Sequence, residues 1–223
     1  MLYLYFKAPF GAFRPFKSVE LSPTAPFVTH SAAYGFLLGL AGIDRSRKKD
    51  YLGARIAIGC PRLPKLGRSF QQLIQGQRKL EQETGGDFKL RPFWREVLIN
   101  LEGYISLDHP LLEALVERGV KNPSILDCWG LPFMGDNNFF VERIDVVEEP
   151  QPCKWFCPFE DNLSSQGERL HYLSVWTDYE DSARSKGLLF SLKDGELNDG
   201  KYQPPDKAWI PMIPAGDESS LED

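Results

Sequence analysis

Apolar positions along this chain fall mainly into short runs, which predicts a protein built from several strands and two helices. The aromatic and leucine-rich run 2–7 indicates a buried strand, and the proline-containing segment 8–11 is expected to end it. Apolar and polar residues alternate over 54–60, as in a half-buried strand. Further strand-like runs are 95–107, 170–176, 187–192 and, after two prolines, 208–213.

Two segments have helical character. Residues 32–41 are predicted to form a helix with Ser31 as its N-cap and Gly42 as its C-terminal stop. The glycines inside this segment lower its helix propensity by about 1 kcal/mol each, and they allow another backbone to approach it closely. A second, amphipathic helix is predicted over 110–118, with Asp108 as its cap.

The order of these elements predicts the topology. The chain runs strand, helix, strand, insertion, strand, helix, strand, and this βαββαβ order is that of a ferredoxin-like or RRM core in an α+β protein. The insertion, residues 61–95, is basic, begins with prolines and contains Gly85-Gly86. We expect it to leave the sheet as an extended hairpin with a function of its own, because long excursions from a compact domain usually have one.

Charge is divided unevenly between the two parts of the chain. Residues 1–95 carry 16 Lys and Arg against 6 Asp and Glu, a balance of +10, whereas residues 96–223 carry 10 against 25, a balance of −15; together they give the net charge of −5. This asymmetry predicts one part that faces a polyanion and a separate acidic part. The alternative is that the charges mix in three dimensions and form no patch.

Composition narrows the class of protein further. The 223 residues, 42% of them hydrophobic, are enough for one sizeable core or one domain with a large insertion. No charged segment followed by a long apolar one resembles a secretory signal, and no run reaches the roughly 20 apolar residues of a membrane span. Four cysteines in a chain of this length do not suggest a disulfide framework, so we expect a reducing cytoplasm and no membrane partner. The acidic tail, 216–223, is expected to be disordered.

Two stretches of sequence resemble a known family. The run KAPFGAFRPF, followed by PTAPFVTHSAAYGFLLGLAGI, resembles the start of the CRISPR-associated Cas-five family, the RAMP-superfamily subunits of type I Cascade complexes. The run WGLPFMGDNNFFVERI, residues 129–144, resembles the later glycine-containing segment of that family, in the form seen in its Myxococcus-type and type I-B branches. Over 44–125 the similarity lies in the arrangement of the expected elements and not in sequence motifs, and the last third of the chain is largely unmatched.

The resemblance implies a domain plan and a role. An RRM-like RAMP domain would cover 1–147, with 61–95 as its thumb hairpin, and a smaller β-rich region would cover 148–215. By this resemblance the protein caps the 5′ handle of the CRISPR RNA (crRNA), without a cofactor, in antiviral defence or guide-directed DNA targeting. Its partners would be the backbone and large subunits of Cascade, with target DNA near the PAM as a further candidate.

An aromatic and basic loop is the first candidate RNA site. Rings stack on bases, at about 1–3 kcal/mol per base, while cations contact phosphates. The alternative is that the rings belong to the core and the cations are only solvated. The residues of this loop are Phe13, Arg14, Phe16 and Lys17.

The start of the first helix is the second candidate site. Backbone N–H groups at a helix N-terminus attract phosphate, helped by the helix dipole, and His30 or Ser31 could bond a phosphate or a ribose 2′-OH. Tyr34 lies one turn further on. The alternative is that Ser31 simply caps the helix, and the two interpretations do not exclude each other.

Two groups of cations form the third candidate site. We expect them to make non-specific phosphate contacts that weaken with salt, although each could equally be a solvated side chain. One group follows the first helix and consists of Arg45, Arg47 and Lys48. The other group lies in the expected thumb and consists of Arg62, Lys65, Arg68, Arg78 and Lys79.

Catalysis and metal binding have weaker support. Metal-independent RNA cleavage needs a base that removes the 2′-OH proton. In the family that this chain resembles, the branch that cleaves RNA uses catalytic residues that include an adjacent Lys-His pair, and no histidine of this chain follows a lysine. His30 and Tyr34 could form a catalytic pair instead, so an endoribonuclease that processes CRISPR repeat RNA stays the alternative. Cys153, Cys157 and His171 are one ligand short of the four of a closed zinc site, and Cys128 could be the fourth only by a coincidence of folding, so no metal is expected. The prediction is a non-catalytic RNA-binding subunit; another rival is a core that binds only protein.

Overall fold

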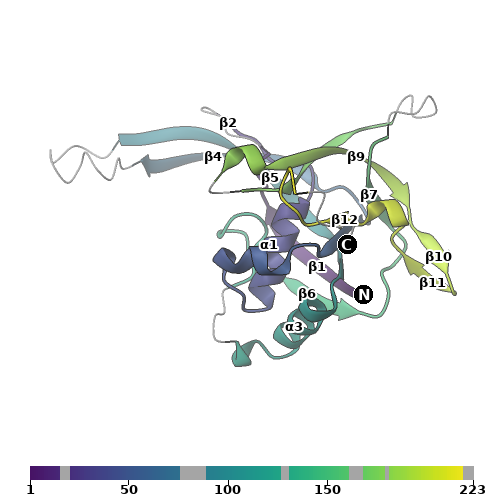
Figure 1. Ribbon diagram of the computed structural model, residues 1–223. Coiled ribbons are helices and arrows are strands. Elements are labelled where there is room, and N and C mark those ends of the chain that lie inside the picture. The colour runs from purple at the N-terminus through teal and green to yellow at the C-terminus, as the bar shows by residue number, and fades with distance from the viewer. Residues whose placement is uncertain (16–20, 76–88, 127–130, 161–167, 179–180, 218–223) are drawn as a thin grey trace.

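A large antiparallel sheet organises the computed structural model, which describes residues 1–15, 21–75, 89–126, 131–160, 168–178 and 181–217 (Figure 1). The helices are α1 (His30–Leu40) and α3 (Pro110–Lys121), with 3-10 turns that include η1 (Arg45–Tyr51) and η5 (Asp206–Ala208). The strands are β1 (Leu2–Gly11), β2 (Leu21–Ser22), β3 (Arg55–Cys60), β4 (Lys65–Gln75), β5 (Lys89–Asp108), β6 (Arg143–Val147), β7 (Lys154–Pro158), β8 (His171–Trp176), β9 (Lys186–Asp194), β10 (Glu196–Asn198), β11 (Lys201–Gln203) and β12 (Ile210–Pro211).

The predicted ferredoxin-like core is confirmed. Its four strands lie in the order β6-β1-β5-β3 and are antiparallel to their neighbours, with α1 following β1 and α3 following β5 in the chain. Beyond β3 the same sheet continues through β7, β9 and β8. The region 148–215 is thus β-rich: β7, β9 and β8 extend the core sheet, β12 pairs with β3, and β10 and β11 form a separate two-stranded sheet.

The first strand is longer than predicted. The expected stop at 8–11 is wrong, since β1 stays paired with β5 as far as Gly11, which is opposite Leu98. The other neighbour, β6, pairs only with residues Tyr3 to Lys7 of β1. Pro9 therefore lies where one side of β1 is open, and a proline is tolerated at a strand edge because its missing N–H breaks no ladder bond.

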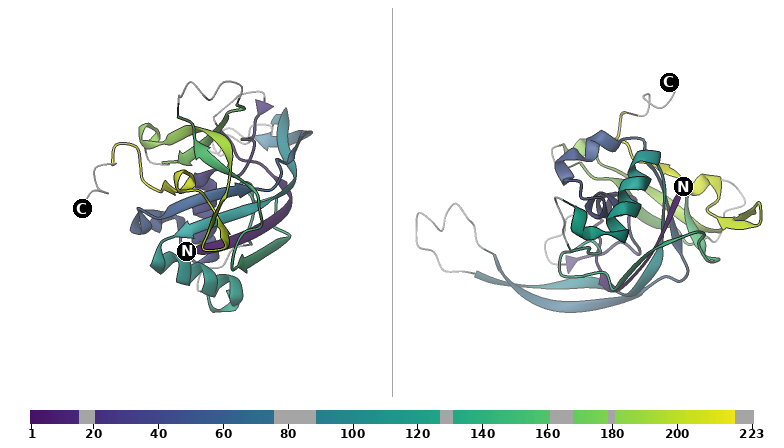
Figure 2. Two further views of the ribbon diagram at one scale, coloured as in Figure 1. Left: turned by 90° about the vertical axis from the view of Figure 1, so that its right-hand side faces the viewer. Right: turned by 90° about the horizontal axis from the view of Figure 1, so that it is seen from below.

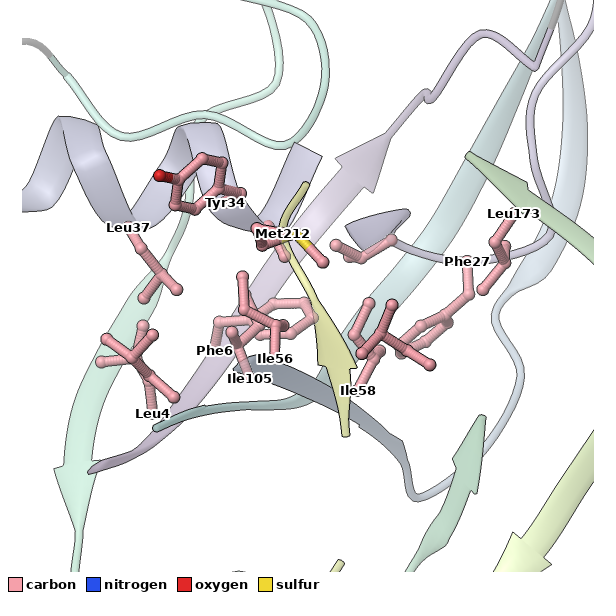
Figure 3. Close-up of a cluster of buried hydrophobic side chains, with 14 of the residues drawn as sticks. Leu4, Phe6, Phe27, Tyr34, Leu37, Ile56, Ile58, Ile105, Leu173 and Met212 are labelled. Atoms are coloured by element: carbon pink, nitrogen blue, oxygen red, sulfur yellow. The ribbon is translucent and has the colours of Figure 1, made fainter. Parts of the chain in front are cut away.

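Side chains of alternate residues build the main core on the helix-bearing face of the sheet. Leu4 and Phe6 of β1 point to this face, where Tyr34 and Leu37 of α1 meet them (Figure 3). The later strands contribute to the same cluster through residues such as Leu173. Each fully buried large apolar side chain stabilises the fold by about 1.5–3 kcal/mol, so the C-terminal strands and the βαββαβ core support one another.

A smaller cluster lies on the opposite face of the sheet. Trp155 is completely buried there, next to Ala57, Tyr104 and the two cysteines Cys153 and Cys157. Chain segments near the C-terminus pack against this cluster through Tyr202, Ala208 and Trp209. The part of the sheet around β3 and β7 is therefore covered on both faces.

The expected hairpin in 61–95 is present in the described residues. Strands β4 and β5 pair from Lys65 opposite Ile99 to Gln75 opposite Lys89, and both ribbons reach well beyond the body of the molecule (Figures 1 and 2). The strand β5 is 20 residues long, so the hairpin is a direct extension of a central strand of the sheet. Asn100, in the left-handed region with φ 56°, lies where the neighbour of β5 changes from β3 to β4.

Both predicted helices exist, but their caps differ from the prediction. The N-cap of α1 is Thr29 and not Ser31, because the Thr29 hydroxyl accepts a hydrogen bond from the N–H of Ala32 at 3.2 Å. The N-cap of α3 is His109 and not Asp108, which is still paired with Arg55 in the sheet. Gly42 ends α1 as predicted, with φ 71°. Neither helix, nor any other in the described parts of the chain, has the length and apolar character of a membrane span.

Candidate nucleic-acid interface

A pocket of about 370 Å³ lies along the outer face of α1. Its lining comes from three parts of the chain that are distant in sequence: α1 itself with η1, the loop 131–135, and the end of β8 with Thr177. Of the residues predicted to bind RNA, the structure brings four to this pocket, namely Ser31, Tyr34, Arg45 and Lys48. The resemblance alone had not placed the second and third of these segments beside the helix.

Two glycines leave the backbone of α1 bare on the pocket side. Gly35 and Gly39 both line the pocket, and a Cβ added to either would meet no heavy atom within 4 Å. A glycine inside a helix costs about 1 kcal/mol relative to alanine. In α1 this loss of helix propensity occurs at the two positions beside which the space is open.

The loop 131–135 is held against the N-terminal loop. Gly135 has φ 79°, and a Cβ there would lie 2.1 Å from the carbonyl oxygen of Ala12, so only glycine fits this close approach. The N–H of Ala12 also donates to the carbonyl of Met134 at 3.2 Å. The two stretches of sequence that carry the family resemblance are therefore packed against each other.

A buried ion pair connects this loop to the root of the hairpin. The guanidinium of Arg95, whose side chain is 8% exposed, donates to Asp136 at 2.5 Å and lies 5.0 Å from the centre of the Phe139 ring. Burial alone would raise the pKa of Asp136, but the hydrogen bonds from Arg95 and Asn138 outweigh it and lower that pKa. The carboxylate is thus kept charged.

Cations from η1 lie at or near the pocket, and each has different contacts. The Lys48 ammonium donates to the carbonyl of Thr177 at 2.6 Å and lies 4.2 Å from the centre of the Trp176 ring. The Arg45 side chain is exposed at the surface, although partial burial lowers its pKa. Arg47 is not among the described lining residues of the pocket and forms an ion pair with Asp50 at 2.9 Å. The described lining residues include these two cations, Arg45 and Lys48, and no carboxylate.

Three predicted contact residues are in the core instead. The stacking role of Phe13 is wrong because its ring is only 3% exposed and belongs to the main hydrophobic cluster. His30 is completely buried with its ring stacked 4.8 Å from that of Phe190, so it cannot reach a phosphate. Tyr34 is 2% exposed, and its hydroxyl donates to backbone carbonyls of Lys48 and Tyr51, at 2.7 and 2.9 Å.

Burial also decides the ionisation of the pair considered for cleavage. It lowers the pKa of His30 to about 3 and raises that of Tyr34, and neither ring nitrogen of His30 has a hydrogen-bond partner in the described part of the protein. A general base must reach the proton that it removes. These two residues, inside the core, have no such access.

The candidate zinc ligands that the structure describes are not gathered into a site. No group of three or more His, Cys, Asp or Glu among the described residues could hold a metal ion, and Cys128 lies outside those residues. Cys60, Cys153 and Cys157 are buried free thiols. Burial raises their pKa values to about 12, 12 and 11, so they are neutral at physiological pH.

The hairpin carries both predicted cations and an aromatic pair that sequence reasoning missed. Arg62, Lys65 and Arg68 are exposed, and Arg68 contacts Glu96 at 3.3 Å. Phe70 and Trp94 are directly opposite each other on β4 and β5, each 53% exposed, with ring centres 5.4 Å apart and edge to face. The available signal was the presence of large aromatic residues, Phe70 and Trp94 among them, inside a basic insertion.

The remaining candidate RNA-binding residues are either at the surface or outside the part of the chain that the structure describes. Arg14 is exposed beside the buried Phe13, and Ser31 is half-buried at the pocket. The predictions for four further residues lie outside the described part of the chain: Phe16, Lys17, Arg78 and Lys79.

Comparison with known proteins gives a likeness of fold. No family model and no curated protein matches the sequence. A chain from a solved "CRISPR RNA-guided surveillance complex" superposes with a TM-score of 0.61 at 11% identity, over 96% of this chain and 91% of that one. A second solved chain, described as "Crystal structure of Cas protein", gives a TM-score of 0.48 at 15% identity, over 92% of this chain and 99% of that one. The protein thus has an RRM-like α+β fold similar to that of a chain in an RNA-guided CRISPR complex.

Proposed function

We propose that this protein is a non-catalytic RNA-binding subunit of a type I CRISPR effector complex, in which it holds the 5′ handle of the crRNA. The observation that carries the proposal is the projecting hairpin, with the exposed Phe70–Trp94 pair among exposed cations. The fold likeness to a chain of an RNA-guided complex supports it.

The hairpin has the chemistry that single-stranded RNA requires. Exposed rings supply stacking surfaces for unpaired bases, worth about 1–3 kcal/mol per base. Lys65 and Arg62 at the root of the hairpin supply phosphate contacts that need no particular base sequence. In an RNA-guided complex the guide reads the target by base pairing, so the protein needs to recognise only the shape and end of the guide.

The acidic part of the chain suits protein partners. A second pocket, between β7, β9 and η5, is bordered by five carboxylates and two lysines. Among the described residues that line the α1 pocket none is a carboxylate, so the described linings of the two pockets carry charge of opposite sign. We assign the cationic side to RNA and the acidic side to the backbone or large subunit of the complex, with target DNA near the PAM as a further contact of the assembly.

The proposal of a non-catalytic role follows from the burial of the His30–Tyr34 pair. A test is to incubate the purified protein with CRISPR repeat RNA in EDTA, where the full-length RNA is expected to persist. Specific cleavage that is lost on a His30→Asn or Tyr34→Phe substitution would favour the rival endoribonuclease.

RNA binding is tested with a Phe70→Ala/Trp94→Ala double variant. Fluorescence anisotropy with a labelled 5′-handle RNA is expected to show a loss of affinity of at least about tenfold, since two stacking surfaces are removed. Tyr172→Ala is the matched control, because Tyr172 is 46% exposed on β8, far along the sheet from the hairpin. Equal affinities of the double variant and the wild type would contradict the proposal, provided that both have the same circular dichroism spectrum.

A further inference from the structure

We infer that the pocket on α1 receives one unpaired nucleobase of the bound RNA, an inference that rests on the proposed function. The hairpin would then supply stacking along the strand, while the pocket would take a base that has left the stack. Shape, charge and polar contacts of the pocket each support this assignment.

The shape of the pocket suits a flat ring. The bare backbone at Gly35 and Gly39 offers a surface without side chains, and Phe133 of the loop 131–135, 43% exposed, adds an aromatic wall. The volume of about 370 Å³ is near the lower end of the roughly 300–1,000 Å³ range of small-molecule pockets. That is room for one nucleotide and too little for a helix of a partner, which needs anchors over two or more turns.

The charge of the pocket suits a ligand that carries phosphate. Arg45 and Lys48 are its charged lining residues, and no described carboxylate is among them. A phosphate that follows the inserted base would meet this positive rim, because η1 lies next to the outer face of α1. An acidic ligand would be accepted on the same grounds, whereas a basic one would be repelled.

A few polar groups could orient the base. Ser31 and Thr177 both line the otherwise apolar pocket, and hydroxyls can donate to or accept from a base edge. Small numbers of polar groups in an apolar pocket are what fixes the orientation of a ligand. An apolar side chain of a protein partner would use the same space but would not need these hydroxyls or the positive rim.

The test fills the pocket without disturbing the fold. Gly35→Leu and Gly39→Leu place side chains into open space, so both variants are expected to fold. Ala114→Leu is the control, because it adds bulk at an exposed position of α3, outside the pocket. The probe is the 5′-handle RNA with the fluorescent base 2-aminopurine placed at one position at a time.

The expected result is a change in 2-aminopurine fluorescence at one position of the RNA on binding to the wild type. This signal should disappear in both glycine variants and persist in Ala114→Leu, with a loss of RNA affinity of about 5- to 150-fold, the equivalent of one stacked base. Folding of each variant is checked by its melting temperature.

Two outcomes would overturn the inference. If the filled variants keep the 2-aminopurine signal and the wild-type affinity, the base lies elsewhere although the protein still binds RNA. If those variants bind RNA normally but lose a protein subunit during reconstitution of the complex, the pocket accepts a protein side chain. Failure of the wild type to bind the RNA at all would instead reject the proposed function itself.

Discussion

Arg95 and Asp136 form a buried contact of 2.5 Å that ties the root of the projecting hairpin to the loop lining the α1 pocket. The two residues are 41 positions apart in sequence, and the Arg95 side chain is only 8% exposed. This pair therefore connects the hairpin to the α1 pocket, the two surfaces that we assign to RNA.

Removing one partner of that pair should be costly. Asp136→Ala leaves the Arg95 guanidinium buried without its counter-charge, which is expected to lower the free energy of unfolding by about 3 kcal/mol, as measured by urea denaturation. The control is Asp145→Ala, because Asp145 pairs with Arg143 at the same 2.5 Å but at an exposed site, where a pair contributes only about 0–1 kcal/mol. Similar losses in the two variants would show that burial of the pair is unimportant.

Two glycines should respond in opposite directions to alanine. Gly135→Ala forces a Cβ against the Ala12 carbonyl at a positive φ, so it should lower the melting temperature. Gly35→Ala meets no atom and replaces a poor helix former, so it should raise the free energy of unfolding by about 1 kcal/mol. Thermal denaturation measures both, and a destabilised Gly35→Ala would mean that the space beside α1 is not open.

The buried histidine should make stability depend on pH. The folded pKa of His30, about 3, is below its ordinary value of 6.5, so protons bind the unfolded chain more readily and stability falls as pH drops from about 6.5 towards 3. The slope is about 1.4 kcal/mol per pH unit for one such group. His171, whose pKa burial also lowers, acts in the same direction.

The matched variant for this effect is His30→Leu, which has no proton to gain. Urea denaturation at several pH values is expected to give a shallower decline for His30→Leu than for the wild type below about pH 6.5. Parallel declines in the two proteins would mean that His30 can be protonated in the folded state.

The salt dependence of the RNA affinity should reveal the phosphate contacts of the hairpin. Each cation that contacts a phosphate of single-stranded RNA contributes about 0.7 to the slope of log affinity against log salt concentration. The Arg62→Gln/Lys65→Gln variant is therefore expected to have a slope smaller by about 1.4 in anisotropy titrations. Lys201→Gln should leave the slope unchanged, because Lys201 is exposed on β11, on the side of the molecule opposite the hairpin (Figure 1). A hairpin variant with the wild-type slope would exclude these cations as phosphate contacts.

Local patterns were sufficient to predict the βαββαβ order, the hairpin and the positions of most elements. Periodicity reports which residues share a face of a strand or helix, and this depends only on neighbours in the chain. The stop at Gly42 was predictable for the same reason, because a glycine at that position can adopt the left-handed conformation.

Contacts between distant segments decided the rest. Phe13, His30 and Tyr34 suit an RNA site in sequence, yet all three are buried. Rings of the C-terminal strands cover His30 and Tyr34, and the loop around Gly135 lies against Phe13, and no local pattern predicts these contacts. Pro9 could continue β1 because the pairing between β1 and β6 reaches only Lys7, which is opposite Arg143, the first residue of β6. The α1 pocket exists because the loop 131–135 and the end of β8 pack beside a helix that precedes them in the chain by about 100 and about 140 residues. Such an arrangement depends on the burial of apolar surface over the whole chain and not on local sequence.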